Sequence, residues 1–352
     1  YRGSCYARVQ EKGDVERLIM DHLHGLGDAP CTDNAVHNVK ANLNSTALCG
    51  TPSHYNIPFW LPDGTSAVGW MPMAGTLVNV HNLARRLRGE AVPQTDVFRL
   101  PTPRLFVTYS LPYAYDPKAD CPKWKAYLAD VQPNPNDQLV LQKLCGLALD
   151  TERRHNVFFI LLGEAGTGKS VFCHVLQHLL GTSNCCVLPL CNLRDRFGSW
   201  MLTEFLANIV SETDETADGR GDLRHVEGLL KMAADHERIH VEHKFNKAGD
   251  APAIALNIFA TNSLPHFSDR SQAIWDRLRV ISFDRRFRGT DKENLNLRHE
   301  IVEQELAGVF TWAVEGLASL LGDTQFPEHS KGIKEKNRHR EKCDPERLFL
   351  EE

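Results

Sequence analysis

The chain has 352 residues, of which 42% are hydrophobic and 24% are charged, so it is long enough for about two globular domains and is not mainly disordered. Its formal net charge of −5 gives no overall electrostatic reason to expect a nucleic acid or a membrane as partner. The longest fully apolar run, residues 157–162, is far shorter than the ~18–20 residues that span a bilayer. These properties favour a soluble enzyme that has no membrane partner.

The first third of the chain is rich in Pro, Gly, Asn and Thr and predicts only short helices, over residues 15–26 and 35–43. Three prolines in the stretch that follows residue 111 predict an extended connector. A helical segment is expected over residues 124–149, with a break near Pro133.

The character of the sequence changes after residue 150. The apolar run 157–162 ends at a glycine, which is typical of a strand buried on both faces of a parallel sheet. Further strands are expected over residues 205–210 and 253–260, and an amphipathic helix over residues 300–321. This alternation of buried strands and helices predicts an α/β fold with a central parallel sheet.

The expected organisation has four parts. They are a smaller mixed or helical domain (1–123), a helical collar or connector (124–150), the α/β domain (151–322) and a basic tail or linker (323–352). Both ends look like those of a piece excised from a longer chain, because the chain starts without an initiator Met and stops inside an apparent helix. Scattered cysteines without a CxxC pair indicate a reducing compartment, and we expect the cytoplasm.

A phosphate-binding motif follows the predicted strand and precedes a helix with apolar residues at helical spacing. The motif, of the form GxxxxGK[ST], consists of Gly163, Glu164, Ala165, Gly166, Thr167, Gly168, Lys169 and Ser170. The glycines let consecutive backbone N–H groups turn around a phosphate, and the helix N-terminus adds partial positive charge. Lys169 is expected to pair with the β- and γ-phosphates of ATP, and Ser170 to ligate Mg²⁺.

ATP hydrolysis by such a loop needs a carboxylate at the end of a neighbouring strand, and Glu212 follows the strand expected over residues 205–210. We expect Glu212 to act as the base, while Asp214 and Glu215 either assist or are solvated loop acids. Asn262 follows the next strand and either holds the attacking water or forms a turn before Leu264-Pro265.

Two basic features come after Glu212. Residues 238–250 predict a hairpin whose tip carries Lys244, Phe245 and Lys247, which fits either a nucleic-acid backbone or a plain surface hairpin. Three arginines, Arg270, Arg277 and Arg279, lie near a later apolar strand. An arginine supplied across a subunit interface would stabilise charge on the γ-phosphate, whereas the alternative is solvated surface arginine.

The order of these parts resembles a superfamily 3 helicase of the phage and plasmid primase-helicase family, which is related to the poxvirus primase-helicase. The segments that carry the resemblance are GEAGTGKS, IVSETDE, LLKMAADHERIHVEHKFNK and IFATNSLPHFSDRSQAIWDRLRVISF. The likeness covers most of residues 68–322, including the helicase's preceding domain.

The resemblance implies an AAA+-like P-loop ATPase that forms a ring, usually a hexamer, and moves 3′ to 5′ on single-stranded DNA. Its functional residues map onto the Walker A pair Lys169 and Ser170, the Walker B acid Glu212, sensor 1 Asn262 and the arginine finger Arg277. Lys244 and Lys247 fall in the region that resembles the DNA-contacting hairpin of the family. Two positions depart from the pattern, because Ser211 replaces an acid and Asp276 precedes Arg277 where relatives often carry a second arginine.

The sequence therefore predicts an ATP-dependent replicative DNA helicase with ATP and Mg²⁺ as cofactors and single-stranded or forked DNA as partner. The alternative is an ATP-switched DNA-binding initiator or loader that does not unwind processively, since it would share every residue of the ATP site. A primase-polymerase domain is expected elsewhere in the parent chain, and the host is expected to be a bacterium or a phage-infected cell. Residues 204–222 sum to −5, the whole net charge, so the acidity lies around the expected Mg²⁺ site and not on the DNA side.

Overall fold

The computed structural model describes residues 57–61, 63–195, 198–212, 224–242, 249–267 and 272–343, together with Cys5. The chain divides into two compact units, one formed by residues 1–68 and 101–109 and the other by residues 69–100 and 110–352. In the first unit, β1 (Phe59–Trp60) pairs with β5 (Leu105–Phe106) in antiparallel register. The helices expected over residues 15–26 and 35–43 lie outside the described residues.

The second unit begins with a small antiparallel sheet. Its strands are β2 (Trp70–Met73), β3 (Thr76–Asn79) and β4 (Phe98–Arg99). Two helices separate β3 from β4, namely α3 (Val80–Leu87) and α4 (Gln94–Val97). The side chain of Asn79 accepts a hydrogen bond of 2.9 Å from the N–H of Asn82, which starts α3 where the strand ends.

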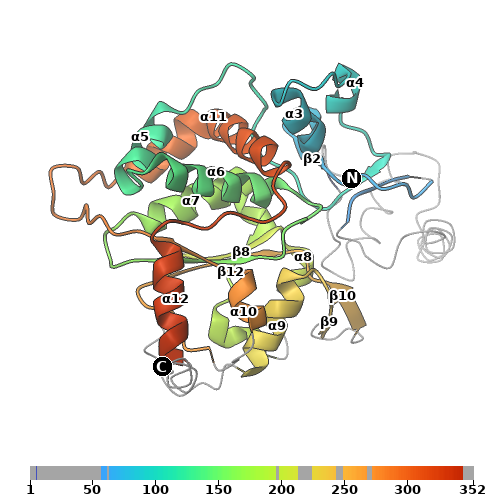
Figure 1. Cartoon of the computed structure of the whole chain (residues 1–352). Coiled ribbons are helices and arrows are strands. Elements are labelled where there is room, and N and C mark those ends of the chain that lie inside the picture. Colours follow the sequence, from blue (N-terminus) through green and yellow to red (C-terminus); the bar gives the residue numbers. More distant parts are fainter. Residues whose placement is uncertain are drawn as a thin grey trace, which may run out of the picture. The chain divides into compact units, whose positions relative to one another are not determined.

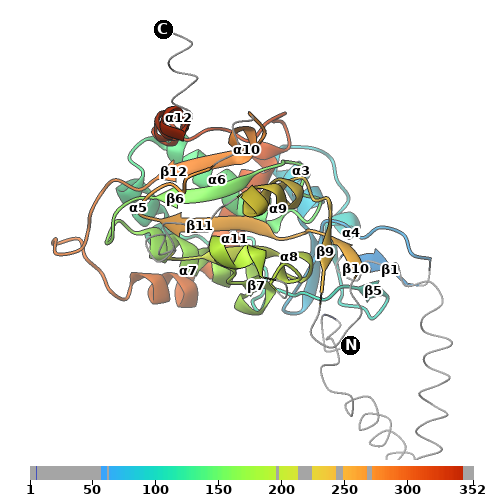
Figure 2. The same ribbon diagram turned by 90° about the horizontal axis from the view of Figure 1, so that it is seen from below.

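The core of this unit is a five-stranded parallel sheet, which confirms the predicted α/β fold (Figure 1). Its strands are β6 (Phe158–Leu162), β7 (Cys185–Cys186), β8 (Ala207–Val210), β11 (Leu256–Thr261) and β12 (Leu278–Ser282). They lie in the order β12, β6, β11, β8, β7 (Figure 2). All of these strands except the edge strand β7 are buried or nearly so along their whole length, as expected for a parallel sheet covered on both faces.

Helices cover both faces of the sheet (Figure 1). One layer contains α5 (Pro122–Val131), α6 (Pro135–Leu149), α7 (Lys169–Leu180) and α11 (Leu297–Leu320). The other layer contains α9 (Arg224–Ala234), α10 (Gln272–Arg277) and α12 (Gly332–Cys343). Short segments complete the domain: α8 (Met201–Glu204) and two 3-10 turns, Thr182–Asn184 and Leu190–Arg194.

The expected collar belongs to the same compact unit as the α/β domain. The break predicted near Pro133 separates α5 from α6, and both helices pack on α11. A Cβ atom added to Gly146 of α6 would lie 2.3 Å from the backbone nitrogen of Leu317, so the two helix backbones are in direct contact. Residues 110–123 lie in the same compact unit as α5 and α6.

The expected basic tail is instead the helix α12, which packs against β12. A Cβ atom on Gly332 would lie 1.7 Å from the carbonyl oxygen of Val280. Lys336 is buried, and its ammonium donates to Leu278 O at 3.2 Å and to the carboxylate of Glu328. Lys331, Lys334, Arg338 and Lys342 are exposed, as expected for a solvated segment. Lys336 differs from that expectation, because these acceptors compensate the burial of a lysine that composition alone marks as exposed.

The predicted hairpin is present as β9 (Arg238–Val241) paired with β10 (Gly249–Pro252). Ile239 and Val241 are buried while Arg238 and His240 are exposed, which is the alternation read from the sequence. The tip residues Lys244, Phe245 and Lys247 lie outside the described residues. Within the described part of the chain, no helix is both long and apolar enough to cross a membrane.

Candidate nucleotide-binding site

The loop of residues 163–168 leaves the carboxyl end of β6 and enters α7, as the motif predicts. Gly166 and Gly168 have φ angles of +83° and +98°, a left-handed conformation that side chains other than glycine rarely adopt. The hydroxyl of Thr167 donates to Glu164 O at 2.8 Å and holds the loop closed on itself. The N-terminus of α7 therefore follows directly on this closed turn, and a helix N-terminus favours an anionic ligand.

Lys169 is the first residue of α7, and only 8% of it is exposed. Its ammonium donates to Gly163 O, to Glu164 O at 2.9 Å and to the Asn262 side-chain oxygen at 3.3 Å. Burial lowers the pKa of Lys169, while nearby groups that include Glu212 oppose that shift. The lysine is a cation held by neutral carbonyl groups, so an anionic phosphate in the loop would be a stronger partner.

Three predicted site residues come together because of the strand order. β11 lies between β6 and β8, and all three strands are parallel, so their carboxyl ends share one edge of the sheet. Lys169 follows β6 through the loop, Asn262 follows β11 directly, and Glu212 lies two residues beyond β8. Glu212 and Ser170 are both exposed at this edge, whereas Asp214 and Glu215 lie outside the described residues.

This edge also contains a topological switch point. The chain leaves β6 towards the β7 edge of the sheet and returns through β8 and β11, and then passes over β6 to reach β12. Ligands of open α/β sheets bind beyond the carboxyl ends of the strands where the connections diverge in this way. Both the sheet topology and the motif therefore place the candidate site at the loop of residues 163–168.

The site is supported by a residue that the sequence analysis missed. Tyr127 of α5 is 6% exposed and donates its hydroxyl hydrogen to Gly168 O at 2.9 Å. A Cβ atom on Gly168 would lie 3.0 Å from Val131 and 3.3 Å from the Tyr127 ring, so α5 is packed directly against the loop. Burial raises the pKa of Tyr127 well above its ordinary value, so its hydroxyl remains a donor. No sequence spacing signals this contact, because 41 residues separate the partners.

The segment that follows β12 also contacts the loop. The N–H of Phe283 donates to Leu162 O at 2.7 Å, and the N–H of Phe287 donates to Gly166 O at 2.8 Å. A Cβ atom on Gly163 would lie 2.2 Å from Phe283 O, which explains a glycine at the first position of the motif. The basic run Arg285-Arg286-Phe287-Arg288 directly after a predicted strand could have signalled this segment.

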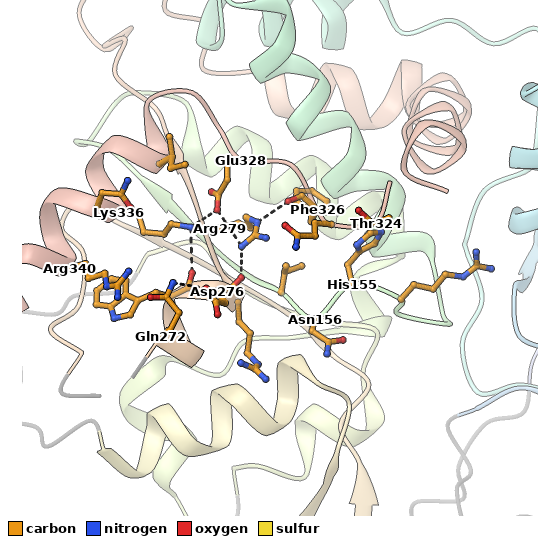
Figure 3. Close-up of a pocket in the computed structure, with 17 residues that line it drawn as sticks. His155, Asn156, Gln272, Asp276, Arg279, Thr324, Phe326, Glu328, Lys336 and Arg340 are labelled. Carbon is orange, nitrogen blue, oxygen red and sulfur yellow. Dashed lines mark hydrogen bonds and ion pairs between the residues drawn. The ribbon is translucent and has the colours of Figure 1, made fainter. Parts of the chain in front are cut away.

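Two of the candidate finger arginines lie away from the loop: Arg277 ends α10, and Arg279, labelled in Figure 3, is the second residue of β12. Arg277 forms a two-pronged ion pair with Asp235, at 2.7 Å and 2.5 Å, and the hydrogen bonding raises its pKa. Arg279 is buried and donates to Phe326 O at 3.1 Å and Asp276 O at 2.6 Å. Arg270 lies outside the described residues.

Arg277 and Arg279 line a cavity of about 690 Å³. It is bounded by His155 and Val157, which precede β6, and by residues of α10 and α12 (Figure 3). Because the phosphate loop follows the carboxyl end of β6, this cavity lies at the opposite edge of the sheet. The structure thus brings Lys169, Asn262 and Glu212 to one edge and places Arg277 at the other.

Comparison with known proteins matches part of the chain to one family model and finds solved structures of low sequence identity. The model of a family of unknown function, DUF5906, matches residues 161–279, from the end of β6 to the start of β12. No curated protein matches the sequence significantly. An apo structure of the NrS-1 C-terminal region (305–718) has a TM-score of 0.50 and 17% identity, over 76% of this chain and 67% of that one.

A second structure of the NrS-1 C-terminal region, the A form apo structure, has a TM-score of 0.48 and 14% identity. The match covers 70% of this chain and 57% of that chain, so the present chain spans little more than half of its length. At these identities, the similarity concerns the fold.

Proposed function

We propose that this chain is the ATP-hydrolysing subunit of a ring-forming DNA helicase used in replication, built on an AAA+-like P-loop domain. The contact between Lys169 and Asn262 at 3.3 Å carries the proposal. It supports a single catalytic centre, because it joins the phosphate loop to the end of the neighbouring strand, with Glu212 at the end of the next strand. A glycine-rich turn that only connects a strand to a helix does not require Asn262 and Glu212 at the same edge of the sheet.

Each residue has a distinct task in the proposed reaction. Lys169 balances charge that develops on the γ-phosphate, and Asn262 orients the attacking water through its amide. Glu212 accepts the proton of that water as its oxygen attacks the γ-phosphorus, while the bond from this phosphorus to the bridging oxygen breaks and ADP leaves. The exposed oxygen ligands of Ser170 and Glu212 suit Mg²⁺, which would neutralise phosphate charge.

The assembly and the DNA contact are further parts of the proposal. In a ring, Arg277 of one subunit would leave Asp235 and complete the site of its neighbour.

The hairpin β9–β10 would carry Lys244, Phe245 and Lys247 to single-stranded DNA, the lysines at the phosphates and the phenylalanine against a base or sugar. Repetition of these lysines around a hexamer would build a positive channel from a chain of net charge −5. Because the lysines would contact DNA phosphates, we expect the affinity for DNA to decrease as the salt concentration rises.

Strand displacement on a forked duplex tests the proposal, with wild type and Lys169→Ala compared in the presence of Mg²⁺ and ATP. We expect displacement by wild type and none by Lys169→Ala. ATPase activity that single-stranded DNA stimulates without displacement would instead identify an ATP-switched initiator or loader. Absence of ATPase activity from the wild type would refute both functions.

Subunit mixing tests the arginine finger. Arg277→Ala and Glu212→Ala subunits are each expected to be inactive alone, because each lacks one half of a shared site. A mixed ring would contain some interfaces with both intact residues, so part of the ATPase activity should return. No recovery in a ring of confirmed mixed composition would contradict a trans-acting Arg277.

A further inference from the structure

The segment after β12 is attached to the phosphate loop through its backbone. The N–H of Phe287 donates to Gly166 O at 2.8 Å, and the N–H of Arg288 lies 3.4 Å from the same oxygen. Gly166 is the central glycine of the motif, between Gly163 and Gly168. These contacts hold Arg288 beside the part of the loop that would enclose a phosphate.

The side chain of Arg288 follows the loop. A Cβ atom added to Gly166 would lie 2.6 Å from Arg288 Cβ and 3.6 Å from Arg288 Cδ. Two carbons of the arginine stem therefore lie over the face of Gly166, and the guanidinium group begins one bond beyond Cδ. Gly166 must lack a side chain both because of its φ of +83° and because Arg288 occupies the space.

The charge of Arg288 is available for a ligand. Arg288 is exposed, and its guanidinium makes no hydrogen bond or ion pair with the parts of the chain that the structure describes. Arg285, three residues earlier, differs because it donates to Asp130 O of α5 at 3.1 Å. Asp130 in turn pairs with Lys292 at 2.6 Å. Of these two arginines, only Arg288 combines contact with the loop and a guanidinium without a partner among the described residues.

We propose that Arg288 is a nucleotide-binding residue that contacts the phosphates of the nucleoside triphosphate held by the loop of its own subunit. The inference rests on the proposed ATP binding. Arg288 would be a second positively charged side chain at the phosphates, besides Lys169. The planar guanidinium presents several N–H donors that match phosphate oxygens. Arg288 acts within one chain and needs no ring, in contrast to Arg277 at the opposite edge of the sheet.

Isothermal titration of the whole chain with Mg²⁺ and the non-hydrolysable analogues AMP-PNP and GMP-PNP tests this inference. Arg288→Gln retains the stem that lies on Gly166 but removes the charge, and Arg288→Lys retains a charge without the planar fork. Arg285→Ala is the matched control, since it removes an arginine of the same segment that points to α5. Thermal melting without nucleotide measures the fold of each variant.

We expect Arg288→Gln to raise the Kd of both analogues roughly tenfold, with Arg288→Lys between it and wild type. Arg285→Ala should remain within about twofold of wild type, and all melting temperatures should be similar because the exchanged side chains are exposed. Equal affinity of Arg288→Gln and wild type would overturn the inference while leaving the proposed function intact. A loss for AMP-PNP alone would also overturn it, because it would indicate a contact to the base. Failure of wild type to bind either analogue, with Lys169→Ala no different, would refute the proposed function itself.

Discussion

The ammonium nitrogen of Lys169 lies 3.3 Å from the side-chain oxygen of Asn262. The two residues are 93 positions apart, and they meet because β6 and β11 are parallel neighbours, with Leu162 opposite Thr261. This contact couples the lysine that would bind phosphate to the amide that would orient water. It therefore makes Asn262 a sensitive position for testing the site.

Replacement of Asn262 by Asp should reduce kcat of ATP hydrolysis at least tenfold. A carboxylate at this position would form an ion pair with Lys169 and hold the ammonium away from the γ-phosphate. Asn262→Ala should also reduce kcat, because it removes the amide that orients water, but it adds no ion pair with Lys169. Steady-state ATPase assays at saturating ATP measure both effects. Wild-type kcat in Asn262→Asp would exclude Asn262 from the reaction.

Tyr127→Phe should weaken nucleotide binding roughly threefold to tenfold and lower the free energy of unfolding by about 1 kcal/mol. The variant removes only the hydroxyl that donates to Gly168 O and keeps the ring packed against the loop. Titration with a nucleotide analogue and denaturant unfolding measure the two effects. Tyr115→Phe is the control, because Tyr115 is a partly exposed tyrosine that stacks on Phe98 away from the loop. The same loss of affinity in both variants would contradict a specific role of the Tyr127 hydroxyl.

Glu305→Ala should lower the free energy of unfolding by about 2–3 kcal/mol. The buried carboxylate of Glu305 on α11 accepts hydrogen bonds from the N–H groups of Lys123 and Trp124, both at 3.0 Å, and so caps the first turn of α5. Denaturant titration measures the loss. Glu303→Ala, an exposed change on the same helix, should stay within about 0.5 kcal/mol of wild type. Similar losses in the two variants would argue against the cap.

Asp235→Asn should destabilise the chain by about 1–2 kcal/mol, because it breaks a half-buried ion pair with Arg277. Arg277 would keep its hydrogen bond of 2.7 Å to Ala273 O, which limits the loss. Glu237→Gln, an exposed neutralisation two residues away, is the control and should have a smaller effect, because Glu237 acts on Arg277 only through its charge and not through a hydrogen bond. Thermal melting at low and high salt checks both. An unchanged melting temperature in Asp235→Asn would show that the pair contributes nothing to stability.

The stability of the fold should fall as the pH decreases from about 6.5 to about 4. Burial lowers the pKa of His236 to about 4, and its Nδ1 hydrogen bonds to Ala253 O at 3.0 Å. The unfolded chain binds a proton near pH 6.5, so protonation favours unfolding below that pH, while above it the contribution is fully present. Between pH 7 and pH 5, wild type should lose about 1–2 kcal/mol more than His236→Gln in denaturant titrations. Equal losses in the two chains would exclude His236 as a source of this dependence.

The amino-acid sequence by itself determined the local elements around the candidate site. The apolar run before Gly163 specifies a buried strand, and the motif specifies a tight turn into a helix, because glycine spacing and hydrophobic periodicity act between residues that are close in sequence. The hairpin β9–β10 and the break between α5 and α6 follow from the same kind of local pattern.

Only the tertiary structure decided which distant groups meet at the loop. The position of β11 between β6 and β8 brings Asn262 to Lys169, and tertiary packing with its hydrogen bonds places Tyr127 and Arg288 against Gly168 and Gly166. The composition of α12 predicts solvent-exposed basic residues. Lys336 is nevertheless buried, because a carbonyl group and the carboxylate of Glu328 accept hydrogen bonds from its ammonium in the fold. Such contacts depend on how complete helices and strands pack, and no periodicity within a short stretch of sequence encodes them.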